Sequence, residues 1–209
     1  MIFRNAVPEE AEKITQLTLD SKRYWGYPEE CITIWTDELT IRPEYIRKNM
    51  IVVAEENSEL LGYVSIIEEP REHVLRVGEY RVSGGFFLDN LFIHPSYIRQ
   101  GIGEKLNTIA FDWCKERQIK RLYIFSDPNA KGFYEKMGAV CLGELSSNNV
   151  GRPLPFLIFD FGSYFLSLLD CQLLKLINVS YEHDLKDGVT IPFLYRRPFV
   201  SLVSFPSAI

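Results

Sequence analysis

The sequence predicts an α/β domain built around a mixed sheet, and three observations support this. The 209 residues fit one domain plus an appendage better than two full domains, since domains commonly run to roughly 100–200 residues. Hydrophobic residues make up 46% of the chain and charged residues 24%, which is the balance of a globular protein with a sizeable core. Strand-like apolar runs alternate with segments of helical periodicity, as in α/β domains. A disordered chain, a collagen-like fibre and a coiled coil are therefore excluded.

The first part of the chain predicts a strand, two helices and a hairpin. Pro8 suits the first position of a helix, and Glu9 and Glu10 follow where the helix dipole favours negative charge. Further along, two apolar runs separated by a charged turn are typical of a β-hairpin. We expect strands over residues 2–6, Met50–Ala54 and Leu60–Ile67, and helices from Pro8 to about Lys22 and over Glu29–Leu39.

Residues 68–85 contain Pro70, many charges and the pair Gly84-Gly85, and they predict an irregular or weakly paired excursion. A second group of regular elements follows it. Gly101-Ile102-Gly103 opens an amphipathic helix, and Asp127 can cap the next helix, which Gly138 can end. The strands expected in this part are Phe86–Ile93, Leu122–Phe125, Ala139–Leu145 and Pro155–Phe161.

The last residues differ from the rest of the chain. Tyr164–Val179 is strongly apolar, with Asp170 and Lys175 as its only charges, but it is too short and interrupted for a membrane span of ~20 apolar residues. Three interpretations remain open: a membrane-surface or partner helix, a helix packed on the domain or on a second subunit of a homodimer, and a poorly ordered tail. We predict a domain over residues 1–162 and an apolar C-terminal extension, helix plus irregular tail, over 163–209.

The net charge and the cysteine content limit the partners and metals that we expect this protein to bind. The net charge of −5 leaves no overall basic surface for nucleic-acid phosphates, so we expect no nucleic-acid partner. The four cysteines form no Cys-x-x-Cys pair and the chain has three histidines, so we expect reduced thiols and no metal site. The N-terminus lacks a signal-peptide apolar stretch, and we expect a cytoplasmic protein.

The segment from Leu88 to Leu106 is the most informative for chemistry. A strand ends at Pro95, a polar loop follows, and Gly101-Ile102-Gly103 opens a helix. The free N–H groups of a helix's first turn and the positive end of its dipole make an anion site that suits a pyrophosphate. Arg99 adds a cation and Gln100 a further donor. The pattern is neither a Walker loop nor the dinucleotide fingerprint, which needs a third glycine.

A second segment, Ser126-Asp-Pro-Asn-Ala-Lys-Gly-Phe-Tyr-Glu-Lys-Met-Gly-Ala139, follows at a suitable distance. Together the two segments resemble the GNAT superfamily of acetyl-CoA-dependent N-acetyltransferases over about residues 2–162. This resemblance implies a mixed, mostly antiparallel central sheet flanked by helices. Ala130 and Tyr134 match the superfamily's Asn-x-x-Ala-x-x-x-Tyr pattern, in which Asp127 replaces the asparagine. Ile98 stands where Arg or Gln is usual. Ser21–Tyr27 and Gly151–Pro155 also resemble signatures of a bacterial subgroup whose acceptors are mostly undefined.

The resemblance implies direct transfer of an acetyl group from acetyl-CoA, the donor substrate, to a primary amine of a small molecule within a ternary complex. Tyr134 matches the superfamily's general acid, and the alternative is a core-facing aromatic beside Phe133. Asp89 is the candidate general base, in phase with Leu91 and Ile93 on its strand; the alternative is a solvated or ion-paired aspartate, and Glu68 and Glu69 are other candidate bases. His94 is expected to be a loop residue.

The backbone amides of Phe92 and Ile93 are expected to face the thioester and pantetheine, where the superfamily separates two central strands. The residues expected to bind the cofactor are Leu91, Phe92, Ile93, Arg99, Gln100, Gly101, Ile102, Gly103, Glu104, Lys105, Asp127, Asn129, Lys131, Phe133 and Tyr134.

Acceptor recognition is assigned to Tyr24, Trp25 and Tyr27, which can form an aromatic wall, and to Arg152, which can pair a substrate carboxylate. The alternatives are a hydrophobic plug under the helix pair and a loop-fixing arginine. At the level of function, two alternatives to a small-molecule acetyltransferase remain: a non-catalytic acyl-CoA-binding or protein-interaction module on the same fold, and an acetyltransferase of peptide or protein amines.

Overall fold

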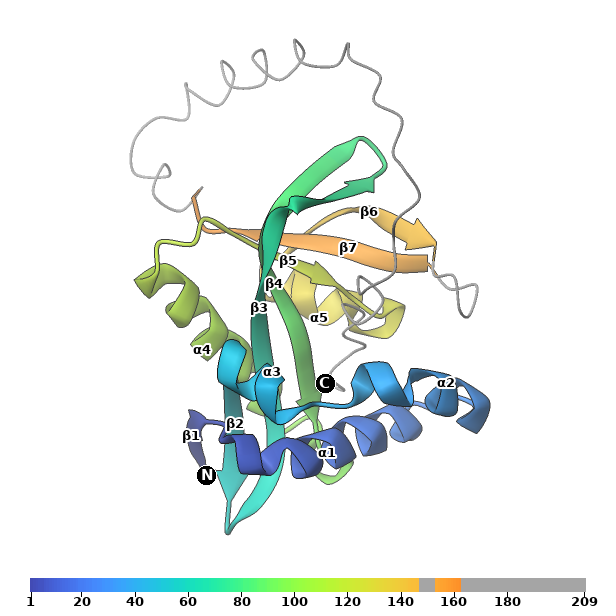
Figure 1. Ribbon diagram of the computed structural model, residues 1–209, viewed down its shortest axis with the longest axis vertical. Helices are drawn as coiled ribbons and strands as arrows, with labels where there is room; N and C mark the ends of the chain where they lie inside the picture. Colours follow the sequence, from blue (N-terminus) through green and yellow to red (C-terminus); the bar gives the residue numbers. More distant parts are fainter. Residues whose placement is uncertain (147–152, 163–209) are drawn as a thin grey trace.

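The computed structural model describes residues 1–146 and 153–162. A seven-stranded sheet with the order β1-β2-β3-β4-β5-β7-β6 forms its centre (Figure 1). The strands are β1 (Ile2–Asn5), β2 (Met50–Glu56), β3 (Glu59–Val77), β4 (Tyr80–Ile93), β5 (Arg121–Phe125), β6 (Val140–Ser146) and β7 (Pro153–Asp160). Neighbouring strands are antiparallel except β4 and β5, which are parallel. The mixed, mostly antiparallel sheet expected from the sequence is confirmed.

Helices cover both faces of this sheet. They are α1 (Ala11–Tyr24), α2 (Glu29–Leu39), α3 (Pro43–Lys48), α4 (Ile102–Glu116) and α5 (Lys131–Lys136), with short 3-10 turns at Pro8–Glu10, Pro95–Tyr97 and Pro128–Ala130. Leu106 of α4 and Phe133 of α5 pack with Leu91 and Ile93 in what we call the α4-side core. Ile14 of α1 and Ile46 of α3 pack with Phe92 in what we call the α1-side core. Because neighbouring residues of a strand point to opposite faces, the two cores lie on opposite faces of β4.

The expectation of an irregular excursion over residues 68–85 is wrong. Strands β3 and β4 continue through this region as one long hairpin, paired from Val74 with Ser83 to Val77 with Tyr80, and only the step between Glu69 and Val74 breaks the register. The hairpin extends beyond the neighbouring strands in Figure 1. Val77 and Val82 are buried against Phe125 and Phe156 of β5 and β7, so packing stabilises a segment whose composition does not indicate a strand.

Helix α3 was not expected from the sequence. It has six residues, too few to show helical periodicity, and it begins at Pro43 in the first position. Ile46 anchors it in the α1-side core. This short helix carries Tyr45 to the sheet, where its hydroxyl contacts β3 and β4.

The predicted extension over 163–209, including Tyr164–Val179, lies outside the described residues. Within residues 1–146 and 153–162, no helix is both long enough and apolar enough to span a membrane.

Candidate active site

The loop between β4 and α4 places a helix N-terminus at a sharp backbone turn. Gly101 is the residue before the helix and has a φ of 77°, and Arg99 has a φ of 63°. The first α-helical bond runs from the amide of Lys105 to the carbonyl of Gly101, at 3.2 Å. The amides of Ile102, Gly103 and Glu104 therefore have no acceptor within the helix and are available to an anion.

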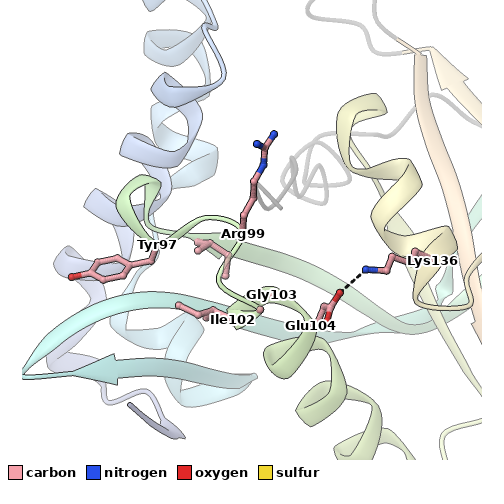
Figure 2. A pocket seen from close by; sticks show the side chains of 8 residues that line it. Tyr97, Arg99, Ile102, Gly103, Glu104 and Lys136 are labelled. Carbon is pink, nitrogen blue, oxygen red and sulfur yellow. Dashed lines mark hydrogen bonds and ion pairs between the residues drawn. The ribbon is translucent and has the colours of Figure 1, made fainter.

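A cavity of about 300 Å³ lies at this helix end. Figure 2 shows its lining side chains around the turn into α4. The lining residues are Ile93, Tyr97, Arg99, Gly101, Ile102, Gly103, Glu104 and Lys136. Five of the loop and helix residues assigned to the cofactor from the sequence thus meet at one cavity, together with Ile93 at the end of β4.

Two cations lie at the rim of this cavity. Arg99 extends away from the loop, and Lys136 of α5 points toward Glu104 (Figure 2). The ammonium of Lys136 pairs with the Glu104 carboxylate at 2.8 Å, which ties α5 to the first turn of α4. Gln100 instead donates to the carbonyl of Ser96 at 3.2 Å, and it does not line the cavity. Lys105 is exposed and also lies outside the lining.

Strands β4 and β5 pair only at Phe86 with Leu122 and at Phe87 with Tyr123. From Leu88 onward, the edge of β4 that faces β5 has no partner strand in the described chain. The amide of His94 donates to the carbonyl of Leu61 on β3, at 2.8 Å. Since hydrogen-bonded pairs alternate along an antiparallel ladder, the amides of Leu91 and Ile93, rather than that of Phe92, point into the gap between β4 and β5.

Tyr134 lies in the α4-side core, with 1% of its surface exposed. Its ring packs edge-on against Phe133 at 5.1 Å and against Phe159 at 6.5 Å between centroids. Helix α5 thus places Tyr134 on the face of the sheet that carries the cavity. Both interpretations made from the sequence, general acid and core aromatic, are compatible with this placement.

Asp127 connects the loop after β5 to the predicted acceptor segment. One of its oxygens accepts from the amide of Asn129 at 2.8 Å, and the other accepts from the Tyr27 hydroxyl. The carboxylate is fully buried. Asn129 itself is exposed, and Lys131 pairs with Glu135 on its own helix at 3.8 Å. These three residues lie outside the cavity lining.

The acceptor segment divides into an exposed and a buried part. Tyr24 is 55% exposed and packs edge-on against Trp25, whereas Tyr27 is buried against Trp35. Lys22, one turn earlier, is completely buried. Its ammonium lies 5.4 Å from the Tyr27 and Trp35 ring centroids and 5.7 Å from that of Phe92, which are cation–π distances. Arg152 lies outside the described residues.

Asp89 does not share a face with Leu91 and Ile93, contrary to the sequence-based expectation. Ser65 pairs with Asn90 while Ile66 pairs with Leu88, so Asp89 is the extra residue of a β-bulge. Leu88, Leu91 and Ile93 point into the α4-side core. The bulge turns Asp89 and Asn90 together to the opposite face, where both contact Tyr45.

The Asp89 carboxylate is 4% exposed, and burial raises its pKa to about 7, with the negative charge of Glu69 adding to the increase. Hydrogen bonds from Tyr45 and Asn90 act in the opposite direction. A carboxyl group that titrates near neutral pH can exchange protons with an amine under physiological conditions.

Four residues at or near the site were not assigned from the sequence. Tyr97 lines the cavity from the 3-10 turn that follows β4. Lys136 belongs to the quoted Phe-Tyr-Glu-Lys-Met-Gly motif and is identifiable by its position two residues after Tyr134. Lys22 lies in the quoted acceptor segment, but a lysine at the end of a helix normally indicates a solvated charge. Tyr45 gave no signal, because the helix that carries it was not expected.

Comparison with known proteins identifies the family. The family model described as the acetyltransferase (GNAT) family matches residues 12–139. The chain belongs to this family. The match extends from α1 to the end of α5, so it contains the cavity, the gap between β4 and β5, and Tyr134.

Three relatives of this GNAT chain are between 18% and 32% identical to it in sequence. The peptidyl-lysine N-acetyltransferase YiaC of Escherichia coli is 32% identical over 106 residues, which cover 50% of this chain and 61% of YiaC. The chain thus spans less than two thirds of that relative. Among solved structures, a GCN5-related N-acetyltransferase of Rhodopseudomonas palustris has a TM-score of 0.59 at 18% identity, covering 76% of this chain and 94% of its own. The PaiA N-acetyltransferase of Thermoplasma acidophilum, solved with coenzyme A, has a TM-score of 0.55 at 20% identity. The match covers 76% of this chain and 98% of the PaiA chain.

Proposed function

We propose that this protein is an N-acetyltransferase that moves an acetyl group from acetyl-CoA to a primary amine by direct transfer. One observation carries the proposal: the free amides at the start of α4 border a cavity, and the gap between β4 and β5 opens beside it. A diphosphate and a thioester of one donor molecule can therefore be bound by adjacent parts of the fold. The similarity to PaiA, solved with coenzyme A, supports this donor.

The amides of Ile102, Gly103 and Glu104 would bind the diphosphate, and Arg99 at the rim adds a positive charge. The same cavity ends at Ile93, whose amide points into the gap. The amides of Leu91 and Ile93 would donate to the thioester oxygen as negative charge develops on it during attack. Because these donors are fixed by the sheet, they need no reorganisation in the transition state.

Acid and base roles fall to Tyr134 and Asp89. Asp89 takes one proton from the acceptor ammonium, which frees the nitrogen lone pair to form the bond to the acetyl carbon. The carbon–sulfur bond then breaks, and the sulfur receives a proton from Tyr134, which solvent reprotonates. The second nitrogen proton is lost to solvent. The products are an amide, coenzyme A with a free thiol, and one proton, because one of the two protons lost by the ammonium is balanced by the proton gained by the sulfur.

A small-molecule amine is our first candidate acceptor. The sheet-facing residues of the predicted acceptor segment, Lys22 and Tyr27, are buried, and Tyr27 is tied to Asp127, which favours an enclosed site over an open groove. A peptidyl lysine is the second candidate, because YiaC is a peptidyl-lysine N-acetyltransferase. Release of coenzyme A from acetyl-CoA, measured with a panel of small amines and a panel of lysine peptides, distinguishes the two.

Tyr134→Phe separates an enzyme from an acyl-CoA-binding or protein-interaction module. Loss of the general acid should lower kcat by about 100-fold or more on the best amine, while calorimetry should give an unchanged affinity for coenzyme A. Phe159 of β7 packs edge-on against the Tyr134 ring and is not assigned to the cofactor, so Phe159→Leu is the matched control for disturbed packing. Turnover on no amine or peptide, with coenzyme A still bound, would favour the module. No heat on titration with coenzyme A would contradict both.

A further inference from the structure

Four polar side chains meet at the bulge of β4, on the face covered by α1 and α3. They are Tyr45 from α3, Ser65 from β3, and Asp89 and Asn90 from β4. The Tyr45 hydroxyl donates to Oδ2 of Asp89 and lies 2.8 Å from the Ser65 hydroxyl. The side-chain nitrogen Nδ2 of Asn90 lies 2.7 Å from the same Oδ2 and 3.0 Å from each of the Tyr45 and Ser65 hydroxyls, and its two hydrogens are shared among these three acceptors.

The two oxygens of Asp89 are therefore in different environments. Oδ2 accepts two hydrogen bonds, whereas Oδ1 is buried and has no hydrogen-bond partner in the described chain. An unpaired carboxylate oxygen in a protein interior is costly unless a ligand or a proton satisfies it. The arrangement fixes the carboxyl group through one oxygen and leaves the other for a proton donor.

We propose that Tyr45 is a positioning residue for acetyl transfer, whose hydroxyl orients Asp89 so that Oδ1 receives the proton of the acceptor amine. The inference rests on the proposed function, in which Asp89 is the general base. Tyr45 does not touch the reacting atoms. It acts through Asp89, and it is delivered by a helix whose only buried residue is Ile46.

The titratable groups that act on Asp89 come from α3 and β3. Helix α3 contributes Tyr45, whose hydroxyl donates to the carboxylate. Strand β3 contributes Tyr63 and Glu69, and Glu69 is paired with His73 at 2.7 Å. The Tyr45 hydrogen bond lowers the pKa of Asp89 against the effects of burial and Glu69. Removing that hydroxyl should therefore raise the pKa of Asp89.

Tyr45→Phe tests the inference, with Tyr63→Phe as its matched control. Tyr63 is buried in the α1-side core and Tyr45 is partly buried against it, but the Tyr63 hydroxyl bonds to Thr18 at 2.8 Å and not to Asp89. In Tyr45→Phe, the acidic limb of the kcat/KM profile should move upward by about one pH unit, with roughly tenfold lower activity below the limb. In Tyr63→Phe the limb should keep its wild-type position. A merely structural role for Tyr45 would lower activity at every pH without moving the limb, which would overturn the inference.

Titration of the Asp89 carboxyl by infrared spectroscopy, assigned by the signal lost in Asp89→Asn, needs no turnover. A midpoint that rises in Tyr45→Phe and not in Tyr63→Phe supports the inference, whereas an unmoved midpoint overturns it.

Absence of wild-type turnover on every amine and peptide overturns the proposed function, and with it a role of Tyr45 in transfer. An active wild type with unmoved limb and midpoint overturns the role of Tyr45 alone. If Tyr45→Phe fails to fold, Ser65→Ala replaces it, because this variant removes a hydrogen-bond partner of Tyr45. It should raise the acidic limb and the infrared midpoint, each by less than Tyr45→Phe would.

Discussion

At the scale of single residues, the bulge at Asp89 couples a protonation equilibrium to folding. The carboxyl has an ordinary pKa of 3.8 and a pKa of about 7 in the folded protein, mainly because burial disfavours its charge. Between these two values the folded state holds a proton that the unfolded state has lost. The contribution of Asp89 to stability is therefore most favourable at low pH and declines as the pH rises through this window.

Asp89→Asn should remove this dependence. Asparagine resembles the protonated acid, so the variant and the wild type should have similar free energies of unfolding near about pH 4, and the variant should be more stable by a few kcal/mol near about pH 8. Urea denaturation across the pH range measures the difference. A gap between the two proteins that stays constant with pH would contradict a raised pKa of Asp89.

The position of Asp89 illustrates what strand alternation can predict. The period of two correctly places Leu91 and Ile93 on the helix α4 side, but one inserted residue reverses the side on which Asp89 lies. No local pattern in Leu88-Asp89-Asn90-Leu91 marks the insertion, because the bulge depends on how these residues pair with Ser65 and Ile66 on another strand. The apolar neighbours of Asp89 in the sequence mark its carboxylate as unusual. Its contact with Tyr45 could not be predicted, because tertiary packing brings the two residues together.

At the scale of elements, the turn into α4 uses two glycines for different reasons. Gly101 has a φ of 77°, which side chains disfavour, while nothing in the structure would obstruct an added Cβ. Gly103 has ordinary helical geometry, and a Cβ there would meet Ile93 and Phe133 at normal contact distances of 3.9 Å. Gly103 also lines the cavity. An added Cβ at Gly103 would therefore change the lining of the cavity without straining the backbone.

Substitution by alanine should separate the two roles. Gly103→Ala should leave stability unchanged or raise it by about 0.5–1 kcal/mol, because alanine favours a helix, while weakening coenzyme A binding by about tenfold or more. Gly101→Ala should instead lower stability by about 1 kcal/mol. Thermal denaturation and calorimetry measure the two effects. Equal coenzyme A affinity in Gly103→Ala and wild type would contradict a ligand at this helix end.

Elements with strong internal signals were predictable from the sequence, and elements formed by distant packing were not. Helix α4 shows the expected buried face, including Ile102, Leu106, Ala110 and Cys114. The outer part of the β3–β4 hairpin is charged and contains Gly84-Gly85, so its stability depends on contacts of Val77 and Val82 with strands β5 and β7. Helix α3 is too short to carry a periodic signal. Sequence reasoning therefore located the loop of the cavity but missed the helix behind Asp89.

At the scale of the whole molecule, strand β7 determines where the domain can end. It lies between β5 and β6, and its residues Phe156, Leu157 and Phe159 are buried. Phe161, after the strand, packs against Phe111 of α4 with ring centroids 5.3 Å apart. Residues up to Gly162 thus include all seven strands that the structure describes, and the boundary between a domain over 1–162 and an extension over 163–209 stays a prediction.

Two truncated chains test this boundary. A chain of residues 1–162 should fold cooperatively and bind coenzyme A with wild-type affinity, because every described strand and core residue is retained. A chain of residues 1–152 should fail to fold, since β5 and β6 would both lose β7, which is the only neighbour of β6 among the described strands. Circular dichroism, thermal denaturation and calorimetry provide the readouts. Aggregation of the 1–162 chain would show that the extension is needed for a stable domain.

The short pairing between β4 and β5 has a consequence for compounds that would block both substrates at once. The helix end that we propose for the diphosphate and the Asp89 cluster lie on opposite sides of the sheet, and beyond Phe87 the strands β4 and β5 are not paired. Under the proposed function, a bisubstrate inhibitor that connects coenzyme A to an amine would have to pass between these two strands. Its linker has to be slender and unbranched at the crossing, so that chain thickness, rather than linker length, sets the limit on such designs.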